Sequence, residues 1–301
     1  MKRKILIVGL GGMGEAHLKS ILKLKNYEIE IYEKNFKRLN FLKNKYKSYN
    51  IKFLDSLPKN KKYYLSIISS NPKERFKITK TLLRENKLSY ILLEKFVFSK
   101  SNEYVKTLRY IKQKNVKAYV NTWAYFIINH LRLKLKDEKI SVDIFINSGG
   151  MLTNLIHFLS LFSLLKNDFS LKLENKKNIK FFPSKNNFYH EMSGKVFFKS
   201  FDESKLSVQS KILKDKIFMI VIKSKNNNLK INLTNDLKIK MVDIISSKKK
   251  SIKFPVASNV TGKNIKNFNK TLFLDYKLIE KNSLLILDFL KKSYKNQIFV
   301  R

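Results

Sequence analysis

The chain of 301 residues has no cysteine, four prolines and a single tryptophan. Without cysteine there are no disulfide bonds, thiolate metal ligands or cysteine nucleophiles, and a reducing compartment is expected, so we predict a cytoplasmic protein. No apolar run reaches the ~18 residues that a membrane-spanning helix needs. The composition, 44% hydrophobic and 29% charged, is typical of a globular protein, and the length predicts two domains.

Acidic residues are scarce, because 63 Lys and Arg stand against 23 Asp and Glu and give a formal net charge of +40. Such a charge attracts nucleic acid. However, only seven of the basic residues are Arg, whose planar guanidinium reads phosphates and base edges, and the lysines are spread along the whole chain. We therefore expect no specific nucleic-acid partner and no membrane partner. A basic nucleic-acid binder stays as an alternative, supported by the charge alone.

Glycine is rare as well, and half of the eight glycines lie within six residues near the start of the chain. They are Gly9, Gly11, Gly12 and Gly14. An apolar run at residues 5–8 predicts a buried strand before them, and residues 9–14 match G-x-G-x-x-G. A helical pattern follows, and then a second strand that ends at Glu33, 19 residues after Gly14. This order and spacing predict a dinucleotide-binding βαβ unit.

Each part of this unit has a physical role in holding a dinucleotide. Gly9 permits a tight turn, Gly11 lets the backbone approach a pyrophosphate, and Gly14 lets the helix pack closely on the strand. The start of the helix supplies free N–H groups and partial positive charge. We expect residues 9–14, with Gly12 and Met13 among them, to bind the cofactor; the alternative is a tight turn without a nucleotide.

Glu33 bears on which dinucleotide is bound. A carboxylate at this place accepts hydrogen bonds from the adenosine ribose and repels a 2′-phosphate, which favours NAD. Lys34 and Arg38 follow closely and are able to bind that phosphate, so NADP stays open.

Strand and helix patterns alternate up to about residue 120, with further strands expected at 51–54, 63–69, 90–93 and 118–120. This alternation predicts a doubly wound parallel sheet whose ligands lie beyond the carboxyl ends of the strands. Later strand patterns without alternating helices predict a mostly antiparallel sheet. The predicted fold is α/β: a Rossmann domain over residues 1–117 and an α+β substrate-binding and oligomerisation domain over residues 118–301.

Three segments resemble the Gfo/Idh/MocA family of glucose–fructose oxidoreductase and inositol dehydrogenase. Residues 5–95 are similar to its N-terminal domain, in which the fourth strand leads into a segment like Ser70-Asn71-Pro72 and the fifth ends in Glu-Lys-Pro, here Glu94-Lys95-Phe96. Residues 149–161 are similar to its active-site helix, and residues 254–261 to the segment before its last helix.

The resemblance implies an NAD(P)-dependent oxidoreductase that acts on a CH–OH group of a sugar, sugar nucleotide or polyol, and surface-polysaccharide metabolism is one setting that it suggests. It also implies homo-oligomers formed through the antiparallel sheet. The further cofactor contacts that it implies are Ser70, Asn71, Pro72, Glu94 and Lys95.

Hydride transfer to a carbonyl needs a proton donor, and Lys95 is our first candidate for it. His157, on an apolar helix, is the second catalytic candidate through its match to the active-site helix, and Asn154 and Thr153 are expected to contact the substrate. The ordinary alternatives are an exposed lysine and a buried core histidine. The four scattered histidines show no metal-ligand spacing, so no metal is expected.

The chain departs from the family pattern at the active-site helix. Thr153 replaces the acid four residues before His157, Ser160 replaces the acid three residues after it, and Phe96 replaces the proline. Thr153 cannot act as a carboxylate base. A non-catalytic dinucleotide-binding protein of the same fold is therefore the alternative to the enzyme. In the enzyme, Lys95 and His157 are expected to line the crevice between the domains.

Overall fold

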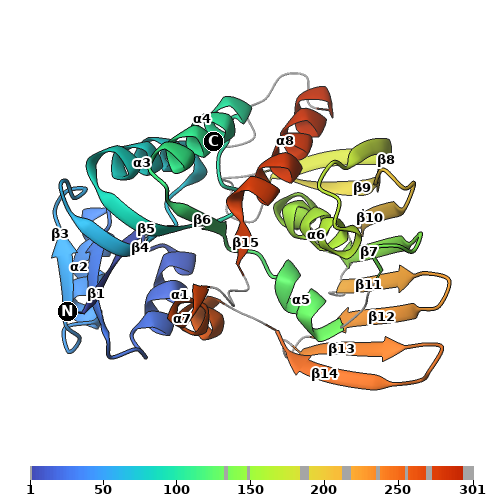
Figure 1. Ribbon diagram of the computed structural model, residues 1–301, viewed down its shortest axis with the longest axis horizontal. Helices are drawn as coiled ribbons and strands as arrows, with labels where there is room; N and C mark the ends of the chain where they lie inside the picture. The colour runs from blue at the N-terminus through green and yellow to red at the C-terminus, as the bar shows by residue number, and fades with distance from the viewer. Residues whose placement is uncertain are drawn as a thin grey trace. The chain divides into compact units, whose positions relative to one another are not determined.

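The computed structural model describes residues 2–131, 135–147, 150–183, 190–211, 218–234, 238–254, 257–268 and 273–293. The chain divides into two compact units, Met1–Thr122 with Pro255–Glu280, and Trp123–Phe254 with Lys281–Arg301 (Figure 1). The first crossing between the units is close to the predicted boundary at 117. The prediction of one continuous second domain differs from this division, because residues 255–280 return to the first unit.

The first unit is built on a seven-stranded sheet in the order β15-β6-β5-β4-β1-β2-β3. Its strands are β1 (Arg3–Val8), β2 (Tyr27–Tyr32), β3 (Ile51–Leu54), β4 (Lys62–Ile68), β5 (Lys87–Leu93), β6 (Lys117–Val120) and β15 (Leu274–Asp275). Neighbours from β6 to β3 are parallel, and only β15 pairs antiparallel. The strand order reverses between β1 and β4, which is where sheets of this kind bind their ligands. The predicted doubly wound sheet is confirmed.

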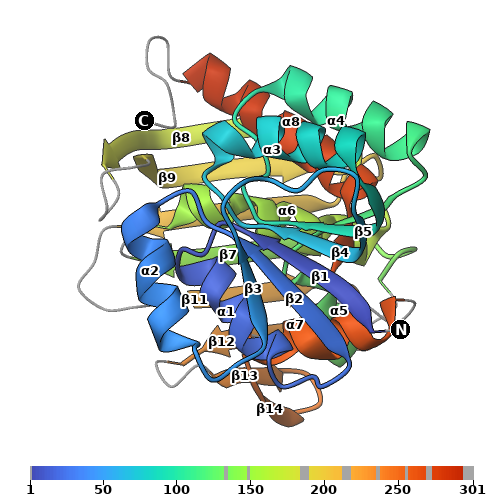
Figure 2. The same ribbon diagram turned by 90° about the vertical axis from the view of Figure 1, so that its left-hand side faces the viewer.

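In the described part of the chain, five helices belong wholly to the first unit, and Figure 2 labels each of them. They are α1 (Gly12–Ile21), α2 (Phe36–Lys45), α3 (Pro72–Glu85), α4 (Ser101–Gln113) and α7 (Ala257–Lys266). The core strand β1 is a continuous apolar run because helices cover both faces of a parallel sheet, and Ile5, Leu6 and Ile7 are fully buried.

The returning segment packs on β5 and β6 of the sheet. Phe268, just after α7, stacks on Tyr90 of β5 with ring centroids 4.0 Å apart and on Tyr119 of β6 at 5.4 Å. At Gly262, α7 comes so close to α1 that a Cβ would lie 2.5 Å from the carbonyl oxygen of Ser20. The Gly262 amide donates to Ser20 Oγ at 2.8 Å. This packing explains why a segment far along the chain joins the first unit.

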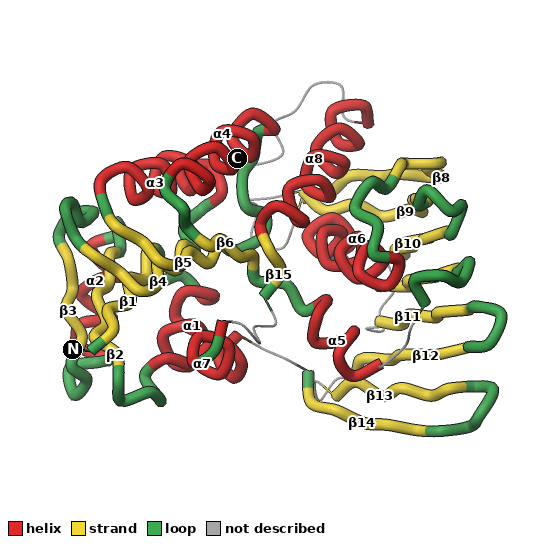
Figure 3. Tube along the Cα trace, viewed as in Figure 1, coloured by secondary structure: helices red, strands yellow, loops and turns green. Residues whose placement is uncertain are grey.

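The second unit contains an eight-stranded sheet in the order β14-β13-β12-β11-β7-β10-β9-β8 (Figure 3). Its strands are β7 (Ser141–Asn147), β8 (Lys172–Pro183), β9 (His190–Lys199), β10 (Lys205–Lys211), β11 (Phe218–Lys223), β12 (Asn228–Leu233), β13 (Lys238–Asp243) and β14 (Lys249–Lys253). Every pairing is antiparallel except that of β7 with β10, so the predicted mostly antiparallel sheet is confirmed.

Two helices of the second unit are α5 (Ala124–Leu131) and α6 (Met151–Lys166), and α8 (Tyr276–Ser293) begins in the first unit and continues in the second. The side chains of α6 are buried along nearly its whole length, and it packs on β7, β9 and β10. Residues 269–272 lie outside the described part, and Leu274 and Asp275 form β15 directly before α8. None of the described helices is both long and apolar enough to cross a membrane.

Candidate functional site

The glycine turn after β1 is shaped by two glycines that no other residue fits. Gly9 has a φ of 81°, in the left-handed region, and a Cβ there would lie 2.6 Å from the backbone nitrogen of Ser70. A Cβ on Gly14 would overlap the carbonyl oxygen of Gly9. The turn is also tied to the end of β2, because the Gly9 amide donates to the Tyr32 carbonyl at 2.9 Å. Both glycines therefore allow β1, α1 and the end of β4 to approach one another.

Gly11 and Gly12 differ from these two, because a Cβ at either position would meet nothing within 4 Å. Gly11 is the N-cap of α1 and lacks a side-chain cap. The first N–H groups of a helix have no acceptor within the helix, and they lie at its positive end. The turn thus leaves an open backbone cradle that fits a pyrophosphate, and the Met13 side chain beside it is exposed.

Glu33 lies against this cradle at the end of β2. Its Oε2 accepts a hydrogen bond of 2.6 Å from the Leu10 amide, and its Oε1 accepts one of 2.9 Å from the Asn35 amide. These bonds place the carboxylate beside the glycine turn, as the spacing from Gly14 predicts for an acid that meets a ribose.

The two cations with the potential to bind a 2′-phosphate both have carboxylate partners. Lys34 Nζ lies 2.6 Å from Glu74 Oε1. Arg38 pairs with the Glu15 carboxylate, and its Nε donates to the Leu10 carbonyl at 3.0 Å. Lys34 is therefore held in a surface ion pair, whereas Arg38 shares the single charge of Glu15 with Lys19 and Lys45.

Glu15, in the first turn of α1, is the centre of this charge cluster. Its Oε1 accepts hydrogen bonds from Lys45 at 2.7 Å and Tyr46 at 2.8 Å, and Arg38 binds its Oε2. Burial alone would raise the pKa of Glu15, but the hydrogen bonds from Lys45, Tyr46 and Arg38 outweigh burial and lower the pKa to about 2. The ionised carboxylate thus holds α1 and α2 together.

We expect Glu15→Gln to lower the free energy of unfolding at pH 7 by about 2 kcal/mol. This is less than the free energy that corresponds to the whole pKa depression, because Arg38 and Lys45 are partly exposed and solvent screens their charges. The pKa is depressed in the folded state, so this stabilisation is present above the ordinary value of 4.5 and is lost as the pH falls towards about 2. Urea unfolding of both proteins from pH 7 to pH 3 measures it. Equal free energies at pH 7 would contradict the assigned role.

The segment after β4 begins α3 directly beside the glycine turn. Asn71 is the N-cap of α3, and its side chain accepts from the Lys73 amide at 3.0 Å, while Pro72 occupies the first turn. The hydroxyl of Ser70 is buried and has no hydrogen-bond partner among the described residues. It is thus a polar group of this cradle that a bound ligand is able to satisfy.

Arg75 on α3 is a site residue that the sequence analysis missed. Its side chain is only 2% exposed, and its guanidinium donates to carbonyls at both strand ends. The acceptors are the carbonyl oxygens of Ser70, Glu94, Phe96 and Val97. Arg75 therefore fixes the loop on both sides of Lys95. The scarcity of Arg in a chain rich in Lys is the one sequence signal for it, and Arg75 shares that signal with six other arginines.

Glu94, at the end of β5, is 4% exposed and points into a buried network. Its Oε1 accepts from His17 Nε2 and from Asn121 Nδ2, each at 2.7 Å. Burial raises the pKa of this carboxyl, but the bonds from His17 and Asn121 outweigh it and keep the pKa below its ordinary value. His17 is a residue of this network that its sequence context did not reveal.

Lys95 follows Glu94 and is partly exposed at the carboxyl end of β5. The Lys95–Phe96 peptide bond is cis, although Phe96 stands where the family motif has proline. The predicted cofactor residues of the first unit therefore all lie at the carboxyl ends of β1, β2, β4 and β5, around the glycine turn.

The predicted residues of the second unit lie on α6. Asn154 Nδ2 donates to the Gly150 carbonyl at 2.7 Å, and Thr153 Oγ1 lies 3.4 Å from the same oxygen. His157 is 4% exposed and stacks on Trp123, with ring centroids 5.0 Å apart. These contacts describe His157 as a packed helix residue, and its catalytic role and that of the substrate candidates stay predictions. Gly149 lies outside the described residues.

The second unit also contains a buried carboxylate that the sequence analysis did not single out. Glu191 on β9 accepts a hydrogen bond of 3.0 Å from the Leu152 amide, in the first turn of α6. It satisfies an N–H group at the positive end of that helix. Its hydrogen bond to the Leu152 amide therefore makes it a cap of α6.

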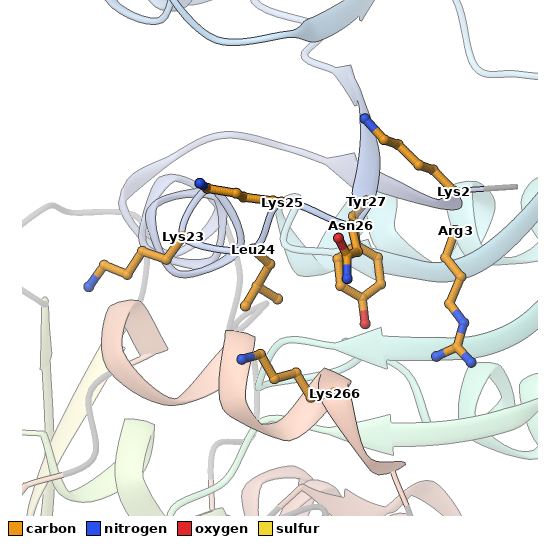
Figure 4. A pocket seen from close by; sticks show the side chains of 8 residues that line it. All are labelled: Lys2, Arg3, Lys23, Leu24, Lys25, Asn26, Tyr27 and Lys266. Atoms are coloured by element: carbon orange, nitrogen blue, oxygen red, sulfur yellow. The ribbon is translucent and has the colours of Figure 1, made fainter.

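A hollow of about 750 Å³ lies at the amino ends of β1 and β2, away from the glycine turn. It is lined by Lys2, Arg3, Lys23, Leu24, Lys25, Asn26, Tyr27 and Lys266. The amines of Lys2, Lys23 and Lys25 lie well apart from one another (Figure 4). Cations after the C-terminus of α1 also complement the helix dipole, so we assign no ligand to this hollow. Among the described residues, no group of three His, Asp or Glu fits a metal ion.

Residues 3–122 match the model of the Gfo/Idh/MocA oxidoreductase family with its NAD-binding Rossmann fold. A sequence comparison with curated proteins found no match. Among solved structures, UDP-N-acetylglucosamine 3-dehydrogenase from Acidithiobacillus ferrooxidans is 9% identical over 96% of both chains, with a TM-score of 0.72. Biliverdin reductase from Synechocystis sp. PCC 6803, with biliverdin and NADP+, is 10% identical over 97% of this chain and 99% of its own (TM-score 0.68).

A Gfo/Idh/MocA family oxidoreductase from Vibrio cholerae is 13% identical over 98% of this chain and 100% of its own, with a TM-score of 0.68. At such identities the likeness is one of fold. The family model assigns the predicted family to residues 3–122, and the structural likeness confirms the predicted fold class.

Proposed function

We propose that this chain, whose residues 3–122 form the NAD-binding Rossmann domain of the Gfo/Idh/MocA oxidoreductase family, transfers hydride to or from a CH–OH group of a sugar, sugar nucleotide or polyol. The observation that carries the proposal is the open backbone cradle at Gly11 and Gly12 with the Glu33 carboxylate beside it. The sugar-nucleotide dehydrogenase among the structures of the same fold supports the substrate class.

The residues of the first unit fit a nicotinamide dinucleotide, which when bound supplies or accepts the hydride. The amides at the start of α1 hold the pyrophosphate, and Glu33 accepts hydrogen bonds from the adenosine ribose. Ser70 offers its buried hydroxyl from the segment that begins α3. Lys95 gives a proton to the substrate oxygen during reduction and takes it back during oxidation.

The preferred cofactor is NAD. The charge of Glu33 opposes a 2′-phosphate, and Arg38 and Lys34 are paired with Glu15 and Glu74. We expect NADH to bind at least about tenfold more tightly than NADPH, a difference of about 1.4 kcal/mol. Fluorescence titration with both cofactors measures it.

Glu33→Gln tests the source of this preference, because it removes the charge and keeps the shape. The variant is expected to lose most of the discrimination, whereas Glu28→Gln, an exposed site on the same strand β2, is expected to keep it. Tighter binding of NADPH by the unchanged protein would contradict the choice of NAD.

Turnover separates the enzyme from its alternative. We expect NADH oxidation in the presence of a member of a panel of keto-sugars, keto-sugar nucleotides and keto-polyols, or the reverse reaction with the alcohols. Tight NADH binding without turnover on the whole panel would favour the non-catalytic dinucleotide-binding protein of the same fold.

A homo-oligomer formed through the sheet of the second unit is also part of the proposal. On β11, Ile220 and Ile222 are buried. Met219 and Val221 alternate with them and are partly exposed apolar side chains on the other face of the sheet. Such a face needs a cover. Light scattering is expected to give a multiple of the chain mass of 35.6 kDa.

Val221→Glu should reduce the mass to that of the monomer, and Lys223→Glu, at the exposed end of the same strand, should not. A monomer mass for the unchanged protein at working concentration would refute the oligomer.

A further inference from the structure

We infer that His17 is a positioning residue, which links the helix at the cofactor cradle to the backbone that carries Lys95. The inference rests on the proposed function, because Lys95 is the proton donor of that proposal. His17 lies outside the glycine motif and its ring bonds Glu94 and Thr261, so we assign its effect on Lys95 to the contact with Glu94.

His17 joins three elements of the first unit. It lies on α1, five residues after the open Gly12, and its side chain is 0% exposed. Its Nε2 is 2.7 Å from Glu94 Oε1 at the end of β5, and its Nδ1 is 2.8 Å from Thr261 Oγ1 on α7. Both ring nitrogens are therefore used, which fixes the orientation of the ring.

The chemistry of the partners places the protons. Hydrogen bonds keep the pKa of Glu94 below its ordinary value, so the carboxylate is ionised and is able only to accept. Nε2 must then carry a proton and donate it to Glu94. The Thr261 hydroxyl is able to serve either form of the ring, since it donates to a bare Nδ1 and accepts from a protonated one.

The main chain at Glu94 and Lys95 is held from a second direction. Arg75 on α3 donates to the carbonyls of Glu94 and Phe96, which flank Lys95. The side chain of Glu94 is held by His17 from α1 and by Asn121 after β6. Arg75 fixes the main chain of this segment. The hydrogen bond from His17 to Glu94 then links it to α1, whose first amides form the cradle, and so sets the position of Lys95 relative to the cradle.

A buried polar pair seldom adds much stability over an apolar pair of the same shape, but it does fix one geometry. The expected loss is therefore in rate rather than in binding. A small displacement of a catalytic group lowers the rate by up to about 10²-fold. His17→Ala should lower kcat by about 10- to 100-fold, with the substrate KM and the NADH Kd within about threefold of the unchanged protein.

Rescue and a matched control separate positioning from packing. His17→Gln offers an amide that is able to donate to Glu94, and it should recover kcat to within about fivefold. Ser20→Ala removes a different hydrogen bond between α1 and α7, that to the Gly262 amide, without touching Glu94, and it should keep kcat. An equal loss in Ser20→Ala would show that helix docking is the cause and would overturn the inference.

Unchanged kcat in His17→Ala would also overturn it. If that variant does not fold, Thr261→Val replaces it as the test, because this isosteric change frees the ring at Nδ1; a loss of about three- to tenfold in kcat is expected, and no loss overturns the inference.

Absence of turnover in the unchanged protein would sink the proposed function, and the positioning role is then decided by hydrogen exchange. The amides of Glu94 and Phe98 donate to the Ile68 carbonyl and to Tyr104 Oη. Exchange over residues 94–98 should be at least about tenfold faster in His17→Ala than in Ser20→Ala. Equal exchange in the two variants would overturn the inference on its own.

Discussion

Replacement of Lys95 by alanine is expected to lower kcat by about 10²- to 10⁴-fold, the range for loss of a positioned acid or base. The NADH Kd should change less than about threefold, because the amides of the glycine turn and Glu33 carry most of the cofactor binding. Lys87→Ala, at the exposed other end of the same strand β5, is the matched control and should keep full activity.

Steady-state kinetics and NADH titration on Lys95→Ala and Lys87→Ala measure both quantities. His157→Ala should cost less than Lys95→Ala, because His157 is buried against Trp123 and Thr153 gives it no acid partner. Thr153→Asp restores the family's acid and is expected to raise the rate. The reverse ranking, with His157 indispensable and Lys95 neutral, would show that the two roles are assigned wrongly.

The second large effect is expected at the tightly packed glycines of the turn. In Gly14→Ala the new Cβ would overlap the carbonyl oxygen of Gly9. In Gly9→Ala it would lie 2.6 Å from the backbone nitrogen of Ser70, and residue 9 would also have to keep a φ of 81°. Each change should lower the free energy of unfolding by about 3 kcal/mol or more, since backbone cannot move aside as a flexible side chain does.

Gly11→Ala is the control, because its Cβ meets nothing within 4 Å, and its stability should stay within about 0.5 kcal/mol. Urea unfolding of the three variants measures the difference. Equal stability of Gly14→Ala and Gly11→Ala would show that the close approach at Gly14 does not constrain the fold.

The first unit was predictable because its signals are local. A continuous apolar run becomes a strand when both sheet faces are covered, so the pattern at residues 5–8 marks β1. The spacing from Gly14 to Glu33 reflects one helix and one strand, and the Leu10–Glu33 bond shows that it brings the carboxylate to the turn. Strand-end positions likewise located Lys95 and residues 70–72.

The missed features depend on contacts between distant parts of the chain. Nothing near Gly262 shows that its lack of a side chain matters until Ser20 lies against it. His17 bonds Glu94 and Thr261, which are 77 and 244 residues away from it in the sequence. The strand β8 was missed for another reason: its lysine-rich sequence lacks an apolar alternation because most of its side chains are exposed.

The central claim is that the open cradle of the glycine turn binds NADH. Its most direct test is a fluorescence titration of NADH with the unchanged protein and with Gly11→Val, whose added side chain enters the open space without meeting the protein near its Cβ. We expect saturable binding by the unchanged protein and at least about 100-fold weaker binding by Gly11→Val, with both proteins equally folded by circular dichroism. Equal affinity in the two, or no binding by either at millimolar NADH, would contradict the claim.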